Sequence, residues 1–114
     1  PVSFNTRLYD ASFPGPTLRI KPGDNVRVLL RNLLGPNIDQ DTYTDNTLHT
    51  PNTTNLHTHG LHISPHMPHD DVLMMSVEPG QENAYFYEIL SEHYPGSFFY
   101  HPHDHGSTFV QVCL

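Results

Sequence analysis

The stretch PGPTLRIKPGDNVRVLLRN, residues 14–32, alternates apolar and charged side chains on both sides of a Pro-Gly-Asp sequence. Alternation with a period of two puts one kind of side chain on each face of a strand, so this stretch predicts two strands joined by a turn at Pro22–Asp24. Further strand-like runs follow at Leu56–Ile63, Val72–Val77, Ala84–Leu90, Phe98–His103 and Ser107–Leu114. About seven short strands with turns between them predict an all-β sandwich. At this length we expect one domain, residues 1–114.

Charge and cysteine content exclude several classes of protein. Twelve acidic residues outnumber five basic ones, which argues against a nucleic-acid partner and is compatible with cations. The one cysteine, Cys113, permits no internal disulfide and is expected to be a small buried apolar residue. No apolar run approaches the roughly 20 residues that span a membrane. The sequence begins at Pro1 with neither an initiator Met nor a signal-peptide pattern, so we expect a processed chain or a fragment.

Six of the ten histidines lie in two short runs, NLHTHGLHIS (residues 55–64) and FFYHPHDHGST (residues 98–108). Residues i and i+2 of a strand point to the same face, so each His-x-His motif presents two imidazoles together. If the two strands are neighbours, four rings surround one volume: His57, His59, His101 and His103. Imidazole suits Cu, Zn, Fe and Ni, and this pattern therefore predicts a metal site.

Several other kinds of metal site also use a His-x-His motif. A cupin would need a Glu shortly after its second His, and HTHGLHISP has none. The hydrolase pattern His-x-His-x-Asp-His is one residue longer than HPHDH. A carbonic-anhydrase-like zinc site, with one more distant His and an open position for water, stays open, as does a set of four strand histidines without any ligand.

Four motifs occur in the order seen in the first cupredoxin domain of multicopper oxidases, the family that includes laccases: FPGPTLRIKPGDNVRVLLRN, TNLHTHGLHISP, VEPGQ and YPGSFFYHPHDHGST. The resemblance covers nearly the whole chain apart from Leu34–Thr54, which is expected to be a long loop. It implies a cupredoxin-like Greek-key β-sandwich. Because the family's first domain continues past GSTFVQV into a closing strand, the resemblance implies that this final strand is missing here.

The resemblance also implies roles for individual residues. His57 would bind a type 2 copper, whereas His59, His101 and His103 would serve a type 3 pair, with His59 and His101 sharing one copper. Asp70 matches the acidic residue that assists proton delivery in this family, with its neighbour Asp71 as the alternative.

In the family this trinuclear copper cluster reduces dioxygen to water with electrons from a reducing substrate. Its other four histidines and the blue type 1 copper belong to a later domain. The implied partners are therefore dioxygen, a reducing substrate, and the remaining cupredoxin domains or another subunit, and the implied compartment is secreted or periplasmic. We expect no oxygen reduction from this chain alone, and the alternative is a stand-alone Cu- or Zn-binding module without turnover.

The other six histidines are not expected to be direct metal ligands. His62 follows the first pair at odd spacing and is expected on the opposite side of its strand. His105 is a candidate hydrogen-bond partner that orients a ligand. The remaining four are expected to be ordinary loop or surface residues: His49, His66, His69 and His93.

Overall fold

The computed structural model describes residues 6–38 and 47–113. Its elements, in chain order, are β1 (Asn25–Arg31), β2 (His57–His59), β3 (Glu82–Glu88), β4 (Phe99–His101) and α1 (Thr108–Cys113). They form two small antiparallel sheets, β1 with β3 and β2 with β4. The predicted all-β class is confirmed, because the regular structure of the described residues is four strands in antiparallel sheets and a single six-residue helix, consistent with a cupredoxin-like fold.

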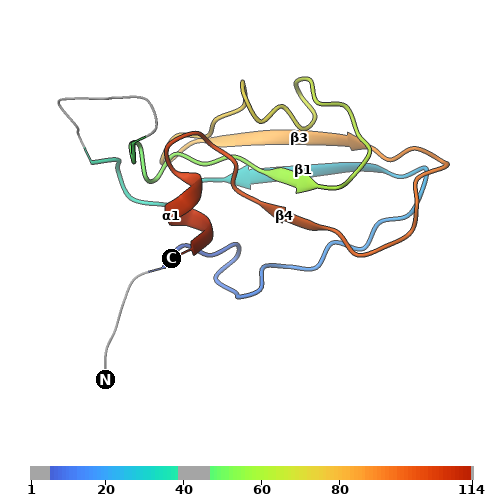
Figure 1. Ribbon diagram of the computed structural model, residues 1–114, viewed down its shortest axis with the longest axis horizontal. Helices are drawn as coiled ribbons and strands as arrows, with labels where there is room; N and C mark the ends of the chain where they lie inside the picture. The colour runs from blue at the N-terminus through green and yellow to red at the C-terminus, as the bar shows by residue number, and fades with distance from the viewer. Residues whose placement is uncertain (1–5, 39–46, 114) are drawn as a thin grey trace.

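The longer sheet forms where the sequence alternates most regularly. The register runs from Asn25 opposite Glu88 to Arg31 opposite Glu82, and the two strands lie along the longest dimension of the molecule (Figure 1). Every second side chain of β1 is partly buried, and the side chains between them are exposed. On the exposed face, Cζ of Arg27 lies 5.6 Å from the ring centre of Phe86 on β3. One face of this sheet therefore packs inward and the other meets solvent, as the alternation predicts.

A small core connects this sheet to the segment that carries the first histidine pair. The buried side chains at its centre are Leu56, Met75, Tyr85, Tyr87 and Ile89. The Leu56 backbone N–H donates to the Tyr85 hydroxyl at 3.1 Å, and Tyr85 is fully buried. Because Leu56 directly precedes β2, this bond fixes the start of β2 against β3.

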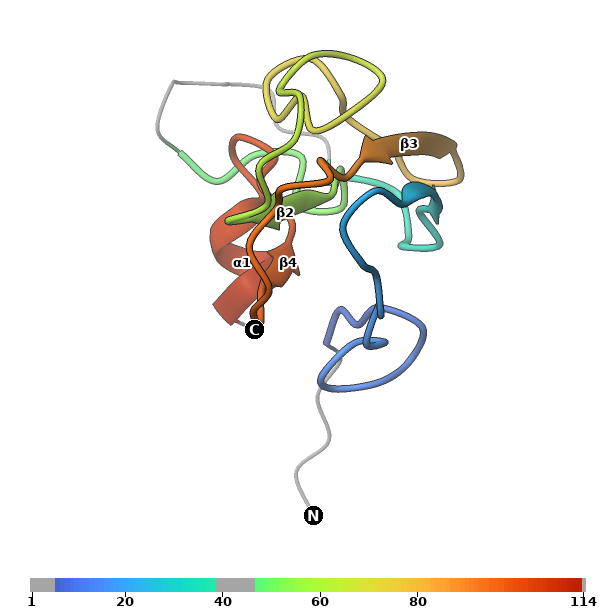
Figure 2. The same ribbon diagram turned by 90° about the vertical axis from the view of Figure 1, so that its right-hand side faces the viewer.

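The short sheet lies beside the helix (Figure 2). In Figure 2, β2 and β4 lie close to α1, while the β2–β3 connection loops out on the opposite side of the molecule from the N-terminal segment. Gln111 of α1 donates to the carbonyls of Pro51 and Thr53, at 3.0 and 2.6 Å, and accepts from the Thr54 hydroxyl at 2.7 Å. These bonds tie α1 to the segment that leads into β2.

Three of the predicted strands are not observed. Leu18 and Ile20 stay largely exposed, because within the described residues no strand pairs with their segment. The run Val72–Val77 makes only an isolated bridge between Val77 and Thr54. The run after Ser107 is the helix α1, since its hydrogen bonds to residues 51–54 outweigh the strand preference of its β-branched residues.

The expectation for Cys113 was also wrong. It sits in the last turn of α1, where Val110 is the buried residue, and its side chain is exposed. The turn predicted at Pro22–Asp24 is confirmed: Gly23 has φ of +84°, which glycine adopts without strain. Gly80 has φ of +81° in a second turn, closed by the hydrogen bond from Gln81 N–H to the Glu78 carbonyl. Among the described residues there is no helix long and apolar enough to cross a membrane.

Candidate metal centre

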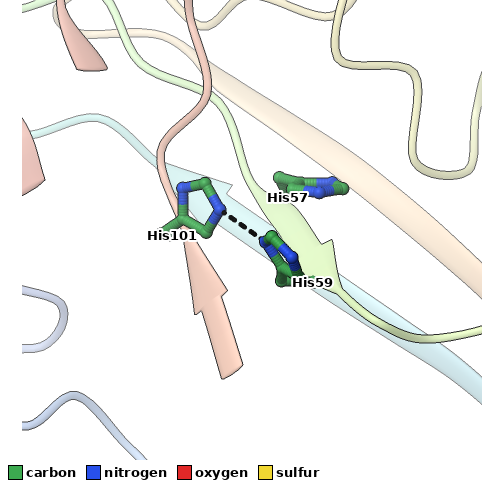
Figure 3. A group of neighbouring side chains, drawn as sticks. All are labelled: His57, His59 and His101. Carbon is green, nitrogen blue, oxygen red and sulfur yellow. Dashed lines mark hydrogen bonds between the residues drawn. The ribbon is translucent and has the colours of Figure 1, made fainter. Parts of the chain in front are cut away.

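The pairing of β2 with β4 brings the two histidine pairs together. His57 lies directly opposite His101, and His59 lies opposite Phe99. Figure 3 shows the rings of His57, His59 and His101 converging from the two strands, and their ligand nitrogens all lie within 4.8 Å of one another. Nδ1 of His59 is 3.4 Å from Nε2 of His101. Side chains more than forty positions apart in the sequence thus meet at one point.

His103 lies just beyond the end of β4. Its ring centre is 5.2 Å from that of His57 and 5.7 Å from that of His101. Its backbone N–H donates to Oδ1 of Asn55 at 2.6 Å, and Asn55 is buried. Nδ2 of Asn55 donates in turn to the Val72 carbonyl at 3.3 Å. Asn55 therefore holds the second histidine pair at a fixed position relative to the strand that carries the first.

Asp70 orients the ring of His57. Its carboxylate is buried, and both of its oxygens lie 3.1 Å from Nδ1 of His57. Oδ2 also accepts from the backbone N–H of Thr58 at 3.1 Å and from its hydroxyl at 2.7 Å. Since a carboxylate only accepts, Nδ1 of His57 carries the proton, and the lone pair of Nε2 is left for a metal.

The hydrogen-bond partners of His101 and His59 also show which ring nitrogen of each carries the proton. Nδ1 of His101 lies 2.7 Å from the Pro102 carbonyl and must donate to it, so Nε2 is an acceptor. The nearby Nδ1 of His59 then donates to that Nε2, and Nε2 of His59 carries a lone pair. Ligating histidines in proteins usually donate their second N–H to a carboxylate or a carbonyl, and His57 and His101 both meet this condition.

The surroundings of His101 favour its neutral form. Burial lowers its pKa, and the nearby imidazoles of His57, His103 and His59 lower it further, against the opposite effect of its hydrogen bond to Pro102. A neutral imidazole is the form that binds metal ions.

The two acidic candidates occupy different positions. Oδ1 of Asp71 accepts from the backbone N–H groups of Leu73 and Met74, at 3.2 and 3.0 Å. Asp71 therefore holds the chain after Asp70, and among the described residues its carboxylate has no hydrogen bond to a histidine. Asp70 is the carboxylate that touches the cluster. Asp104 is buried and accepts from the Ser76 hydroxyl, so it stabilises the segment after His103.

Sequence reasoning missed three residues that shape this site. Thr58 and Asn55 are both buried: the Thr58 hydroxyl donates to Asp70, and Oδ1 of Asn55 accepts from the His103 backbone. Their polar side chains close to His57 in the sequence were the signal that could have revealed them. His49 is buried rather than an ordinary loop residue. Its ring packs on Gly106, and its centre lies 5.4 Å from that of His105.

Comparisons with known proteins agree with this arrangement. The sequence model of the family described as multicopper oxidase matches residues 3–112. The chain belongs to the multicopper oxidase family. It is 32% identical over 108 residues to multicopper oxidase mco of Staphylococcus aureus, and 31% identical over the same length to the protein of that name from Staphylococcus epidermidis. Each match covers 95% of this chain and 20% of the relative, so the chain spans about a fifth of these proteins' length.

The family implies copper, and the residues present fit it. The His57, His59 and His101 donors are imidazole nitrogens, which suit copper, and they lie close enough together to hold one metal ion. The described side chains offer no thiolate here, because Cys113 is exposed on α1.

Proposed function

We propose that this chain is a copper-binding domain that supplies half of the histidine ligands of a type 2/type 3 trinuclear cluster. Its ligands are His57, His59, His101 and His103, as the family resemblance implies. Copper held there would supply single electrons to dioxygen, which the complete protein would reduce to water while a reducing substrate is oxidised elsewhere. The remaining ligands come from further cupredoxin domains or from another subunit.

One observation supports this proposal above all: the imidazoles converge, and in His57 and His101 the Nδ1–H already donates to an acceptor. His57 donates to Asp70 and His101 donates to Pro102, so Nε2 of each ring is unprotonated and can bind a metal. Such orientation reduces the reorganisation that metal binding would otherwise require. Four unliganded strand histidines would have no need of it.

Asp70 is the residue we propose to handle protons near the cluster. It is buried, and it accepts three kinds of hydrogen bond, from the His57 ring, the Thr58 backbone and the Thr58 hydroxyl. Its carboxylate holds a proton at Nδ1 of His57 and thereby keeps Nε2 of that ring available. A group that both orients a ligand and accepts hydrogen bonds is suited to pass protons toward dioxygen.

The solvent-exposed side of the histidine cluster is consistent with a partner domain that covers it. His59 and His103 are exposed, and the ring of Phe99, 59% exposed, stacks on His59 with centres 4.5 Å apart. An exposed aromatic ring beside exposed imidazoles fits a surface that another domain covers. We therefore propose that the cluster is completed from this side.

The test begins with copper binding. The chain is titrated with Cu²⁺ and followed by electron paramagnetic resonance, beside His57→Ala/His101→Ala and the control His66→Ala, which removes an exposed histidine outside the cluster. We expect the parent and the control to bind copper through imidazole nitrogens, and the double variant to lose this copper. Unchanged copper stoichiometry in the double variant would overturn the site assignment.

Oxygen consumption then separates a cluster domain from a stand-alone module. We expect none from the 114-residue chain, and four electrons per dioxygen from a longer protein in which His57 and His101 are intact. A longer protein that binds copper at these residues without consuming oxygen would support the module without turnover.

A further inference from the structure

A second set of metal-binding side chains lies away from the histidine cluster, around a surface pocket of about 280 Å³. The pocket is lined by His62, Ile63, Ser64, His69, Glu88 and Leu90. Two histidines and one glutamate therefore line one pocket, and they come from the β2–β3 connection and the end of β3. None of the three belongs to the site described above.

The ring of His69 is already held as a metal ligand would be. Its Nδ1 contacts the backbone carbonyl of Phe86 on β3. A carbonyl only accepts, so Nδ1 carries the proton and Nε2 keeps its lone pair. Ligating histidines usually have this second bond, which fixes both the tautomer and the ring. The backbone supports the position too, because Phe86 N–H donates to the Pro68 carbonyl at 3.0 Å.

The side chains of His62 and Glu88 are exposed and line the same pocket as His69. The backbone of His62 is fixed by its N–H, which donates to Nε2 of His93 at 2.9 Å, while its own ring is exposed. Glu88 ends β3, and within the described part of the chain its carboxylate makes no hydrogen bond or ion pair. The charge of −7 on the whole chain also favours cations over anions at its surface.

We propose that His62, His69 and Glu88 bind a divalent transition-metal ion, zinc or copper(II), with water completing the coordination. Two imidazoles and a carboxylate with an open position form a donor set that such ions accept. The three ligand groups are less closely assembled than those of His57, His59 and His101, which meet within 4.8 Å. Binding therefore requires the exposed side chains of His62 and Glu88 to rotate toward the anchored His69.

Zn²⁺ is the probe that tests this site. Equilibrium dialysis is carried out in the His57→Ala/His101→Ala background, so that the first cluster does not compete. We expect that removing His62 and His69 together raises the dissociation constant at least about tenfold, and that Glu88→Gln raises it about tenfold. The control is His66→Ala, an exposed histidine of the same connection that does not line the pocket, and it should leave the affinity unchanged.

A second measurement uses the unsubstituted chain and does not depend on how the variants fold. Imidazole ¹⁵N spectra are recorded with and without Zn²⁺, with assignments from through-bond correlations to the backbone. We expect Nε2 of His69 and one nitrogen of His62 to shift, and both nitrogens of His66 to stay in place. Unchanged resonances of His62 and His69 at saturating Zn²⁺, or equal affinity in the variant that lacks both, would overturn the proposal.

Discussion

Substituting Gly106 by Ala tests the packing that anchors the chain just after the second histidine pair. Gly106 has φ of +93°, and a Cβ built there lies 2.2 Å from Cε1 and 2.3 Å from Nε2 of His49. His49 cannot easily move aside, because it is buried and its Nδ1 is 2.8 Å from the Thr47 carbonyl. The substitution therefore combines backbone strain with overpacking.

The expected magnitude follows from these two effects. Left-handed backbone costs a non-glycine residue about 1–2 kcal/mol, and forcing extra atoms into a packed region costs about 1–3 kcal/mol. Gly106→Ala should thus lower the free energy of unfolding by about 2–5 kcal/mol. Gly23→Ala is the matched control, since Gly23 has φ of +84° and nothing within 4 Å of its Cβ position. It should cost only the strain, about 1–2 kcal/mol.

Urea unfolding followed by circular dichroism measures both variants, and a double-mutant cycle isolates the clash. In a His49→Ala background, Gly106→Ala should cost no more than Gly23→Ala does in the parent, because the ring that it would strike is gone. The reasoning is refuted if Gly106→Ala and Gly23→Ala agree within about 0.5 kcal/mol in the parent chain.

Three further predictions concern the residues that support the cluster. Asp70→Asn removes the charge that faces Nδ1 of His57, and copper affinity, measured by competition with a chelator, should fall about 10–100-fold; an unchanged affinity would contradict the orienting role. Asn55→Ala leaves the N–H of His103 without its acceptor, so urea unfolding should show a loss of about 1–3 kcal/mol, and a neutral result would argue against this contact. Burial raises the pKa of Tyr85 to about 12, against roughly 10 in an unfolded chain, so stability that is fully present below pH 10 falls as the pH rises toward 12, by about 3 kcal/mol in all. Tyr85→Phe should make that fall shallower without removing it in denaturation series at different pH values, because burial also raises the pKa of Tyr87 and Tyr9. A fall as steep as in the parent chain would contradict the role of Tyr85.

Local patterns in the sequence predicted the elements whose partners are also regular. β1 alternates along all seven of its residues and β3 along its last four, so the alternation predicted which side chains face the core. The pairing of β1 with β3 and its register are known only from the structure. The segment around Leu18 and Ile20 alternates equally well but has no neighbouring strand in the described chain, and a strand without a ladder is not stable. Whether a partner exists is a property of the whole fold, which a local pattern does not contain.

The same distinction applies to the candidate metal centre. The two His-x-His motifs predicted which imidazoles share a face, and the pairing of His57 with His101 brings those faces together. Asp70 was reached only through the family resemblance. Asn55 was not predicted, because its bond to the His103 backbone spans 48 positions of sequence and depends on how β4 ends. Contacts that are both long-range and polar leave no periodic trace in the sequence.

On the assignment proposed above, the supporting bonds also explain why half of a copper site would keep its shape before the other half binds. His57 is held by a buried carboxylate, His101 by a carbonyl, and the backbone of His103 by Asn55, and none of these bonds requires a metal. His59 and His103 remain exposed, so these rings offer contact to a second set of ligands. Rings that are already oriented lose little conformational freedom when that second set binds, and this lowers the cost of assembling the complete cluster. A domain prepared in this way should bind copper weakly by itself and much more tightly in the assembled protein, where further ligands add their own bonds to ions that this half already positions.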